Sequence, residues 1–153
     1  MKTANNINEL AYLLKAGETE IKIGFKDCSD LYLKLFQQHN IELSYHDLSK
    51  WDVSDVTDMS YMFYKAKHFD GDLSKWDVSN VKSMFHMFSD ATCFDGNIIR
   101  WDVSKVEDVR WMFNDAKSFN QDISKWDLSN ANEKYGMLQD CGIANQFKPE
   151  GID

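Results

Sequence analysis

Tryptophan recurs at a fixed interval along most of this chain, and that spacing constrains the fold more than any other feature. Trp51, Trp76, Trp101 and Trp126 follow one another at steps of 25 residues. The octapeptide DLSKWDVS at 47–54 returns unchanged at 72–79. Columns of Asp, Ser, Met and Phe keep the same register without insertion. A strict short period indicates stacked supersecondary units, each burying its apolar side against the next, which is the pattern of a solenoid.

Each unit is predicted to contain a strand and a helix. Segment 48–54 is short and alternates apolar with polar residues, which favours a strand. From Val56 to Ala66 the apolar residues fall on one face of a helix. Ser54 is placed to cap that helix, and 104–107 matches the capping-box pattern. In the strand, Lys50 and Asp52 project on the same side, so we expect interleaved columns of opposite charge that neutralise each other.

The first 45 or so residues do not follow the repeat. Residues 7–14 are predicted to form a helix that is capped by Asn6 and ends at Gly17. Residues 20–25 are predicted to form a strand, and 29–38 a second helix. Such a unit fits a terminal cap, because the first coil of a solenoid would otherwise expose its core and an unpaired edge.

The predicted fold class is therefore α/β, as one continuous domain. We expect a short right-handed solenoid of four strand-helix repeats of about 25 residues, preceded by a helix-strand-helix cap. The predicted boundaries are 1–45 for the cap, 46–71, 72–96, 97–121 and 122–147 for the four repeats, and 148–153 for a C-terminal tail.

The repeat also resembles a known family. The second copy, DLSKWDVSNVKSMFHMFSDATCFDGN, contains the steps Trp-Asp-Val-Ser, Met-x-x-Met-Phe and Phe-Asp-Gly. In these steps it is similar to the bacterial surface protein 26-residue repeat, also called the BspA-like or DUF285 repeat, over about residues 44–147. The resemblance implies a leucine-rich-repeat-like solenoid with a role in adhesion or protein binding, and it transfers no catalytic residues.

The charge and composition of the chain limit the classes of molecule that it is expected to bind. The formal net charge of −8 disfavours nucleic acid and anionic membranes, since both are bound by basic faces. It favours a basic protein as partner. The N-terminus lacks a basic segment followed by a long apolar run, so we expect a cytoplasmic protein. The three cysteines form no CxxC pair, which favours reduced thiols.

The sequence predicts no catalytic, cofactor-binding or metal-binding residue, and hence no enzyme. The four histidines lack metal-ligand spacing, and no phosphate-binding loop or nucleophile motif is found. Asp70-Gly71-Asp72 could suggest calcium, but its charge is not kept in the later copies, so a turn is the better interpretation.

Positions that vary between copies are the candidates for partner binding. A repeat fixes the columns needed for stacking and leaves free those that face water. The variable columns at positions 60, 61 and 64 of the first copy carry aromatic residues and an arginine, which are the residue types that anchor interfaces. The candidate residues are Tyr61, Tyr64, Phe85, His86, Arg110, Trp111 and Tyr135. The alternative is that some of these rings fold down onto the neighbouring helix.

We therefore predict a non-catalytic protein-protein interaction module. Its specific form would be an intracellular inhibitor or immunity-type protein that neutralises a basic toxin or enzyme, because acidic faces speed association with basic partners. Two alternatives stay open: a bacterial surface adhesion or structural repeat protein lacking its leader, and an acidic DNA mimic. The sequence does not determine the oligomeric state.

Overall fold

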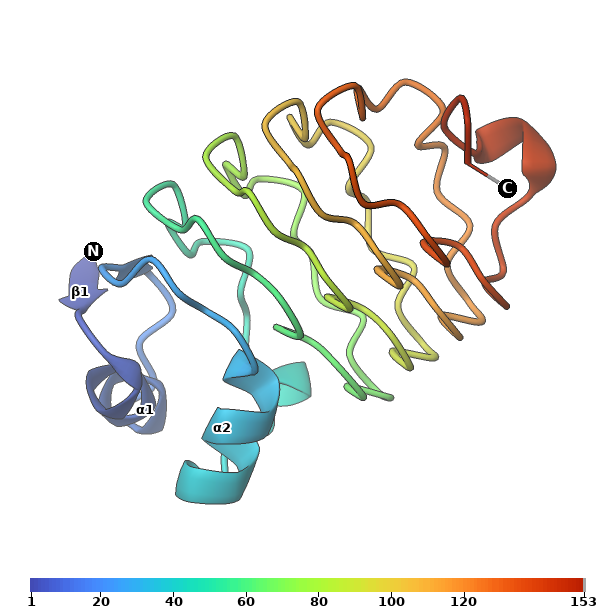
Figure 1. Cartoon of the computed structure of the whole chain (residues 1–153). Helices are drawn as coiled ribbons and strands as arrows, with labels where there is room; N and C mark the ends of the chain where they lie inside the picture. The colour runs from blue at the N-terminus through green and yellow to red at the C-terminus, as the bar shows by residue number, and fades with distance from the viewer. Residues whose placement is uncertain (153) are drawn as a thin grey trace.

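The computed structural model describes residues 1–152, and in it the successive copies lie side by side along one axis. The two termini lie at opposite ends of the stack (Figure 1). We refer to residues 47–71, 72–96, 97–121 and 122–146 as coils 1 to 4. Parallel backbone bridges link neighbouring coils at equivalent positions, from Asp58 to Ser83 and onward to Asp108 and Glu133. We interpret this stack as a short solenoid; the right-handed sense remains a prediction.

The N-terminal unit contains the regular secondary structure. It consists of β1 (Lys2–Ala4), α1 (Ile7–Lys15), β2 (Ile21–Ile23) and α2 (Leu31–His39), with a 3-10 turn at Leu43–Tyr45. The two helices and the strand β2 expected here are confirmed, whereas β1 was not predicted. β1 pairs in parallel with β2, in the register Lys2 to Ile21.

Local sequence explains where the helices begin and end. The side chain of Asn6 accepts hydrogen bonds from the amides of Asn8 and Glu9, both at 3.0 Å, as predicted for a cap. The Glu9 carboxylate accepts the Asn5 amide at 2.9 Å in return, which completes the cap. After α1, Gly17 adopts a positive φ of 79°.

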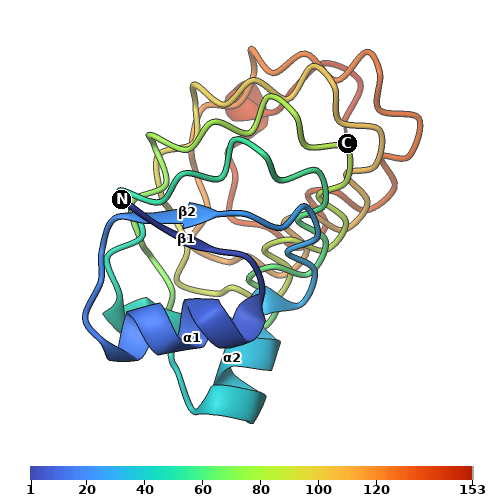
Figure 2. The same cartoon turned by 90° about the vertical axis from the view of Figure 1, so that its left-hand side faces the viewer.

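The N-terminal unit covers one end of the stack (Figure 2). The amide of Ile23 donates to the carbonyl of Asp52 at 2.8 Å, so β2 lies against coil 1. Three amides around the start of α2 also donate to coil 1 carbonyls: Cys28 to Asp58 (2.8 Å), Asp30 to Ser60 (3.0 Å) and Tyr32 to Met62 (3.0 Å). The first coil is thereby paired along both of its sides.

The helix predicted from Val56 to Ala66 is wrong. The front segment of each coil (58–65, 83–90, 108–115 and 133–140) is a ribbon of tight turns. Alternate amides donate to the next coil: Met59 to Ser83 (2.9 Å), Tyr61 to Phe85 (2.8 Å), Phe63 to Met87 (2.9 Å) and Lys65 to Ser89 (2.9 Å). The intervening amides donate three residues back within the same coil, as Met62 does to Met59 at 3.1 Å.

Two residues with a left-handed backbone in each ribbon explain why the apolar spacing predicted a helix that is not present. Tyr61 and Lys65 adopt φ values of 57° and 60°. These reversals turn the side chains at 59, 62, 63 and 66 inward, so an apolar spacing that matches a helix face also matches this ribbon. Because the 104–107 segment opens no helix, its capping box is also wrong; Glu107 instead pairs with Lys82 at 2.8 Å.

The strand predicted at 48–54 is also absent. The back segment of each coil (47–56 and its equivalents) consists of two turns, closed by Trp51 to Leu48 (3.1 Å) and Val56 to Val53 (2.9 Å). The Asp52 carboxylate accepts the Ser54 amide at 3.0 Å, and Asp77, Asp102 and Asp127 do the same for their serines. The aspartates therefore organise the turns, as expected of them, but they do not lead into a helix.

The predicted pairing of the Lys50 and Asp52 columns is not found among residues 1–152. Asp52 lies 3.7 Å from Lys22, and Lys50 lies 3.7 Å from Glu20. The reason is the missing strand: without alternation, the two columns do not share a face.

The core is built from stacked copies of the same side chains, and the buried tryptophan and methionine columns confirm their assignment to it. Phe63 stacks on Phe88 with ring centroids 5.4 Å apart, and Phe88 on Phe113 at 5.5 Å. The Trp76 indole donates to the carbonyl of Leu48 in the preceding coil at 2.9 Å, and that of Trp101 to Leu73 at 3.0 Å.

Asp70-Gly71-Asp72, predicted to be a turn, is an irregular segment between the turns at 67–68 and 74–75, and it links coils. The Asp70 carboxylate accepts the amide of Asp95 at 2.9 Å, and Asp95 accepts that of Asn120 at 2.8 Å. The Asn120 side chain then accepts the amide of Ala144 at 2.8 Å. Asn can replace Asp in this column because both supply the oxygen. The chain continues into a 3-10 turn at Asn145–Phe147.

Candidate protein-binding face

The seven candidate residues lie together on the front of the stack. They occupy the front segments of all four coils and contact one another in series, so the ribbon assembles the group that a helix was expected to assemble. We call this group the aromatic face: Tyr61, Tyr64, Phe85, His86, Arg110, Trp111 and Tyr135. None of them is buried, and Tyr135 is 71% exposed.

Three rings at equivalent positions form the centre of the aromatic face. Tyr61 and His86 stack with centroids 5.0 Å apart and planes 5° from parallel. Trp111 follows at 6.0 Å from His86, tilted by 16°. Because the faces of these rings cover one another, the stack presents ring edges to the surroundings.

The remaining rings pack around this stack edge to face. Phe85 lies 5.1 Å from Tyr61 at 86°, and Tyr64 lies 5.4 Å from Tyr61 at 77°. Tyr135 meets Trp111 at 4.8 Å and 87°. The alternative, that some of the rings lie on neighbouring coils, is therefore true of all of them, yet they remain accessible.

The central position of each front segment has a backbone that favours glycine. Tyr61, His86 and Trp111 adopt φ values of 57°, 54° and 57°, and the same position in coil 4 is Gly136 at 67°. In each coil this residue is the third of a four-residue turn, where positive φ favours Gly or Asn. A left-handed conformation costs a residue with a side chain about 1–2 kcal/mol. Stacking at about 0.5–1.5 kcal/mol per pair offsets part of that cost.

Gly136 leaves the space that the indole ring of Trp111 occupies. A β-carbon at residue 136 would lie 2.4 Å from Cε3 of Trp111, so the indole lies directly on the glycine backbone. A side chain here would displace the ring from its position between His86 and Tyr135. Coil 4 thus ends the ring stack and supports it.

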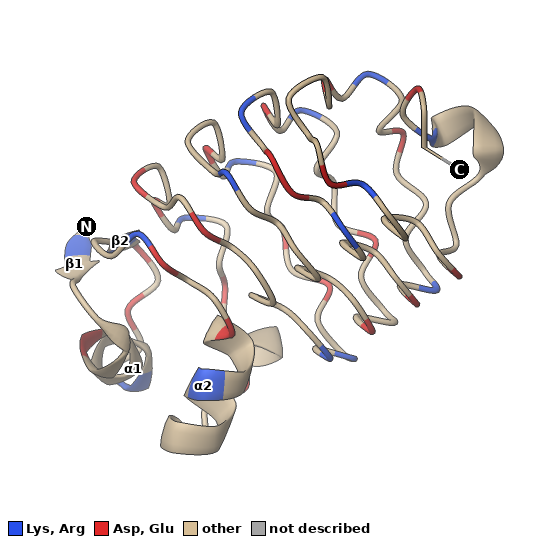
Figure 3. Cartoon of the chain, in the orientation of Figure 1, with Lys and Arg blue, Asp and Glu red and all other residues tan. Residues whose placement is uncertain are grey.

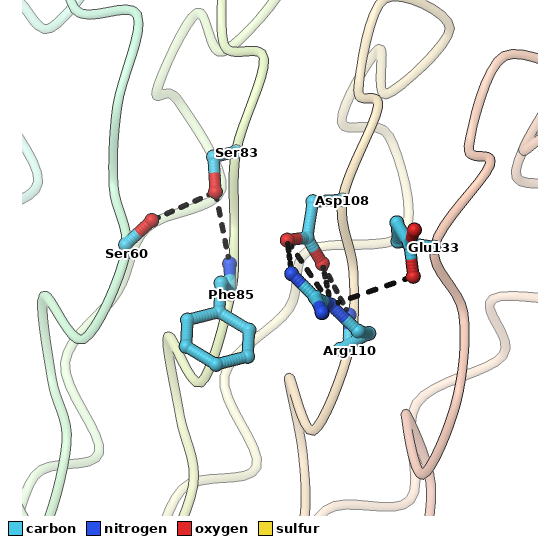
Figure 4. Close-up of polar contacts among 6 residues, drawn as sticks. All are labelled: Ser60, Ser83, Phe85, Asp108, Arg110 and Glu133. Atoms are coloured by element: carbon cyan, nitrogen blue, oxygen red, sulfur yellow. Dashed lines mark hydrogen bonds and ion pairs between the residues drawn. The ribbon is translucent and has the colours of Figure 1, made fainter.

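Arg110 is held rigidly beside the rings (Figure 4). Its guanidinium binds both carboxylate oxygens of Asp108, with Nε to Oδ1 at 3.1 Å and Nη2 to Oδ2 at 2.6 Å. Glu133 lies 3.7 Å away, and the guanidinium carbon sits 4.9 Å from the Phe85 ring centre. The hydrogen bonds to Asp108 raise the pKa of Arg110. Arg110 thus presents a fixed positive charge, with its side chain 39% exposed.

Acidic side chains flank the ring stack on both sides. On one side, the column at position 58 supplies Asp58, Asp108 and Glu133. On the other, the column at position 65 supplies Asp90, Asp115 and Asp140. Figure 3 shows acidic segments recurring along the front of the stack, with basic segments between them. The face is therefore an aromatic stripe between carboxylates.

Burial between the neighbouring rings lowers the pKa of His86, and this outweighs the opposing effect of the carboxylates of Asp90 and Asp108. Burial likewise raises the pKa of Tyr61. The central stack is therefore uncharged, and its charges lie at the rim.

Sequence reasoning missed three residues that shape this face. Asp108 and Glu133 fix Arg110, and their signal was an acidic residue two positions before the variable column. Gly136 supports Trp111, and its signal was a glycine in a column otherwise filled by rings, which points to a positive φ.

Two further features are absent from residues 1–152. No cluster of three His, Cys, Asp or Glu side chains suited to holding a metal ion was found among them. Over the same residues, no helix has the length and apolarity needed to cross a membrane.

The coil stack and its exposed ring column define the class: a repeat protein of short aromatic-rich coils. The chain belongs to the DUF285 family, described as "Mycoplasma protein of unknown function", which matches residues 30–150. The match extends across all four coils and reaches back to α2, so it includes the element that docks on coil 1. Neither the curated proteins nor the solved structures gave a significant match.

Proposed function

We propose that this protein is a non-catalytic interaction module that binds another protein through the aromatic face. One observation carries the proposal. Three bulky rings occupy a turn position whose backbone favours glycine, although Gly136 satisfies the same position in coil 4. Stacking does not require rings there, because the core columns already join the coils. The rings therefore serve contact with something outside the chain.

The composition of the face supports a protein partner. Tyr, Trp and Arg are the residue types that dominate binding energy at interfaces. The rings are held by one another, and Arg110 is held by Asp108, so little side-chain freedom is lost on binding. The flanking carboxylates favour a basic partner, in keeping with the net charge of −8.

The specific form of the proposal is a cytoplasmic inhibitor or immunity-type protein that neutralises a basic toxin or enzyme. An acidic rim speeds encounter with such a partner, and a rigid aromatic centre slows its release. A surface adhesion role would require export, so locating the full-length product separates the two. A DNA mimic would need a uniformly negative face, whereas this one carries neutral rings and Arg110 at its centre.

The test compares two double variants. Phe85→Ser with Trp111→Ser removes two rings of the face, and Lys75→Ser with Lys125→Ser alters exposed residues of the back segments. Each is used to capture partners from the source cells, and the captured protein is then titrated by calorimetry. We expect the ring variant to lose about tenfold or more in affinity and the lysine variant to bind as wild type.

Circular dichroism and melting curves serve as the control. The ring variant should keep the wild-type spectrum, because both rings lie outside the buried core. A collapsed fold would show that the rings are structural, and equal binding by both variants would overturn the proposal. Association should also slow with added salt if the partner is basic.

A further inference from the structure

The hydrogen bonds between neighbouring front ribbons run in one direction, unlike those of an ordinary β-ladder. In a parallel ladder each strand both donates and accepts on each of its sides. Here the alternate amides within the ribbon point toward the C-terminal end, as Trp111 does to Tyr135 at 3.1 Å, whereas the amides that donate to the preceding coil, such as Lys82 to Thr57 at 2.8 Å, lie at the ends of the ribbon or outside it. The carbonyls that receive them all point toward the N-terminal end. Each coil therefore has a donor side and an acceptor side.

The two ends of the stack are treated differently. At the N-terminal end, the unit around α2 donates to the carbonyls of Asp58, Ser60 and Met62. In coil 3 the outgoing donors are Val109, Trp111, Phe113 and Asp115, each bonded to coil 4 at 2.9–3.1 Å. Their equivalents in coil 4 are the amides of Lys134, Gly136, Leu138 and Asp140, and none of these donates to another residue of the described 1–152. We call this row the donor edge.

A pocket lies along the donor edge. It has a volume of about 430 Å³ and is lined by Lys134, Tyr135, Gly136, Met137 and Gln139 on one side and by Gly151 and Ile152 on the other. The C-terminal residues therefore approach the edge without bonding to its amides. An amide without a partner destabilises a protein by about 1–3 kcal/mol when it is shielded from water.

We propose that the donor edge binds a segment of a partner protein that presents a row of backbone carbonyl oxygens. The repeat itself shows what fits: the carbonyls of Glu133, Tyr135, Met137 and Gln139 fill the same donors of coil 3. A single carboxylate would reach only part of such a row. The occupant is thus a peptide segment folded as a front ribbon, added in trans as a further coil.

The same polarity excludes a second copy of this chain. Two donor edges face each other amide to amide, and the acceptor row of coil 1 is already taken by Cys28, Asp30 and Tyr32. The chain should therefore not associate with itself through this edge. Tyr135 belongs both to the aromatic face and to the pocket lining, so one partner can contact both. The inference nonetheless stands without the proposed function, because it rests on backbone groups alone.

Amide hydrogen exchange measured by NMR tests the edge, with coil 3 as the internal control. In the free protein, we expect the four donor-edge amides to exchange on the order of 100-fold faster than their coil 3 equivalents. The probe is a synthetic peptide of residues 122–147, which carries the required carbonyls, beside a peptide with 133–140 scrambled. Excess native peptide should slow exchange at the four amides by about tenfold or more, and the scrambled peptide should not.

A second variant serves as a control in case the synthetic peptide does not fold. Inserting another copy of residues 122–146 after Gln146 adds a fifth coil in cis. Exchange at the four amides should then slow to the coil 3 level. Docking in trans is overturned if the native peptide leaves their exchange unchanged, whatever the fifth coil does. It is also overturned if these amides are protected in the free chain, or if ultracentrifugation shows dimers that protect them.

Discussion

The front and back segments of each coil join their neighbours by different means. In the back segments, side chains make the bonds between coils: the Trp76 indole reaches Leu48 in the coil before, and the Asn80 amide reaches Ser54 at 3.0 Å. In the front segments the backbone makes them, through the alternate amides of the ribbon. Only the first kind of bond depends on which residue is present.

This difference explains where the copies agree and where they diverge. A side-chain bond needs a particular residue, such as the tryptophan whose indole donates in coils 2 and 3, so DLSKWDVS is repeated. A backbone bond forms with almost any side chain, so positions 60, 61 and 64 are free to differ. Variation in the front segments therefore costs the stack little, which is why we propose these positions for binding.

The largest expected effect contrasts two tryptophans. Trp76 lies in a back segment, is 4% exposed and donates to Leu48, whereas Trp111 lies on the aromatic face. Trp76→Ala should lower the free energy of unfolding by about 3–5 kcal/mol, through the lost ring contacts and the cavity left behind. Trp111→Ala should lower it by only about 1 kcal/mol, since it removes ring contacts at the surface and leaves no cavity in the core. Urea denaturation measures both.

Trp76→Phe is the intermediate control. It keeps an aromatic ring in the core and removes the indole donor, so about 1–2 kcal/mol should be lost. If the two alanine variants lost equal stability, the division between a structural back and a free front would be wrong.

Structural features that depend on the identity of particular residues could be predicted from the sequence. Features that depend on the backbone geometry could not. The period, the buried Trp and Met columns and the N-terminal helices followed from pattern alone. The front ribbon was mistaken for a helix because both place residues 59, 62, 63 and 66 inward. No residue-level pattern distinguished the two, apart from Gly136 among the rings. The candidate face was still found, because it was inferred from variation between copies, which does not depend on the secondary structure that presents it.

A smaller effect is expected from changing one residue at a left-handed position. Tyr61→Gly loses its ring contacts but relieves the positive φ, so its unfolding free energy should stay within about 1 kcal/mol of wild type. Tyr61→Val also loses the contacts, and it places a β-branched residue at φ 57°. It should be less stable than the glycine variant by at least about 1 kcal/mol. Thermal and urea unfolding measure the stability of both variants. Equal stability would show that the backbone at residue 61 is not strained.

The smallest expected effect is a pH dependence that arises from the front segments. Burial lowers the pKa of His86 in the folded protein below the value of about 6.5 that it takes when unfolded. Near that pH the unfolded chain binds more protons than the folded chain does. The free energy of unfolding therefore decreases as the pH falls below about 6.5. His86→Gln should flatten the fall in unfolding free energy between about pH 7.5 and about pH 5.5.

Urea denaturation of both proteins across that range gives the comparison. His46, whose pKa burial also lowers, contributes equally to each protein, so the difference isolates His86. An unchanged slope would mean that the ring between Tyr61 and Trp111 is solvated like any surface histidine. The central stack would then be an open row of rings, and the rigidity on which the proposed binding role depends would be lost with it.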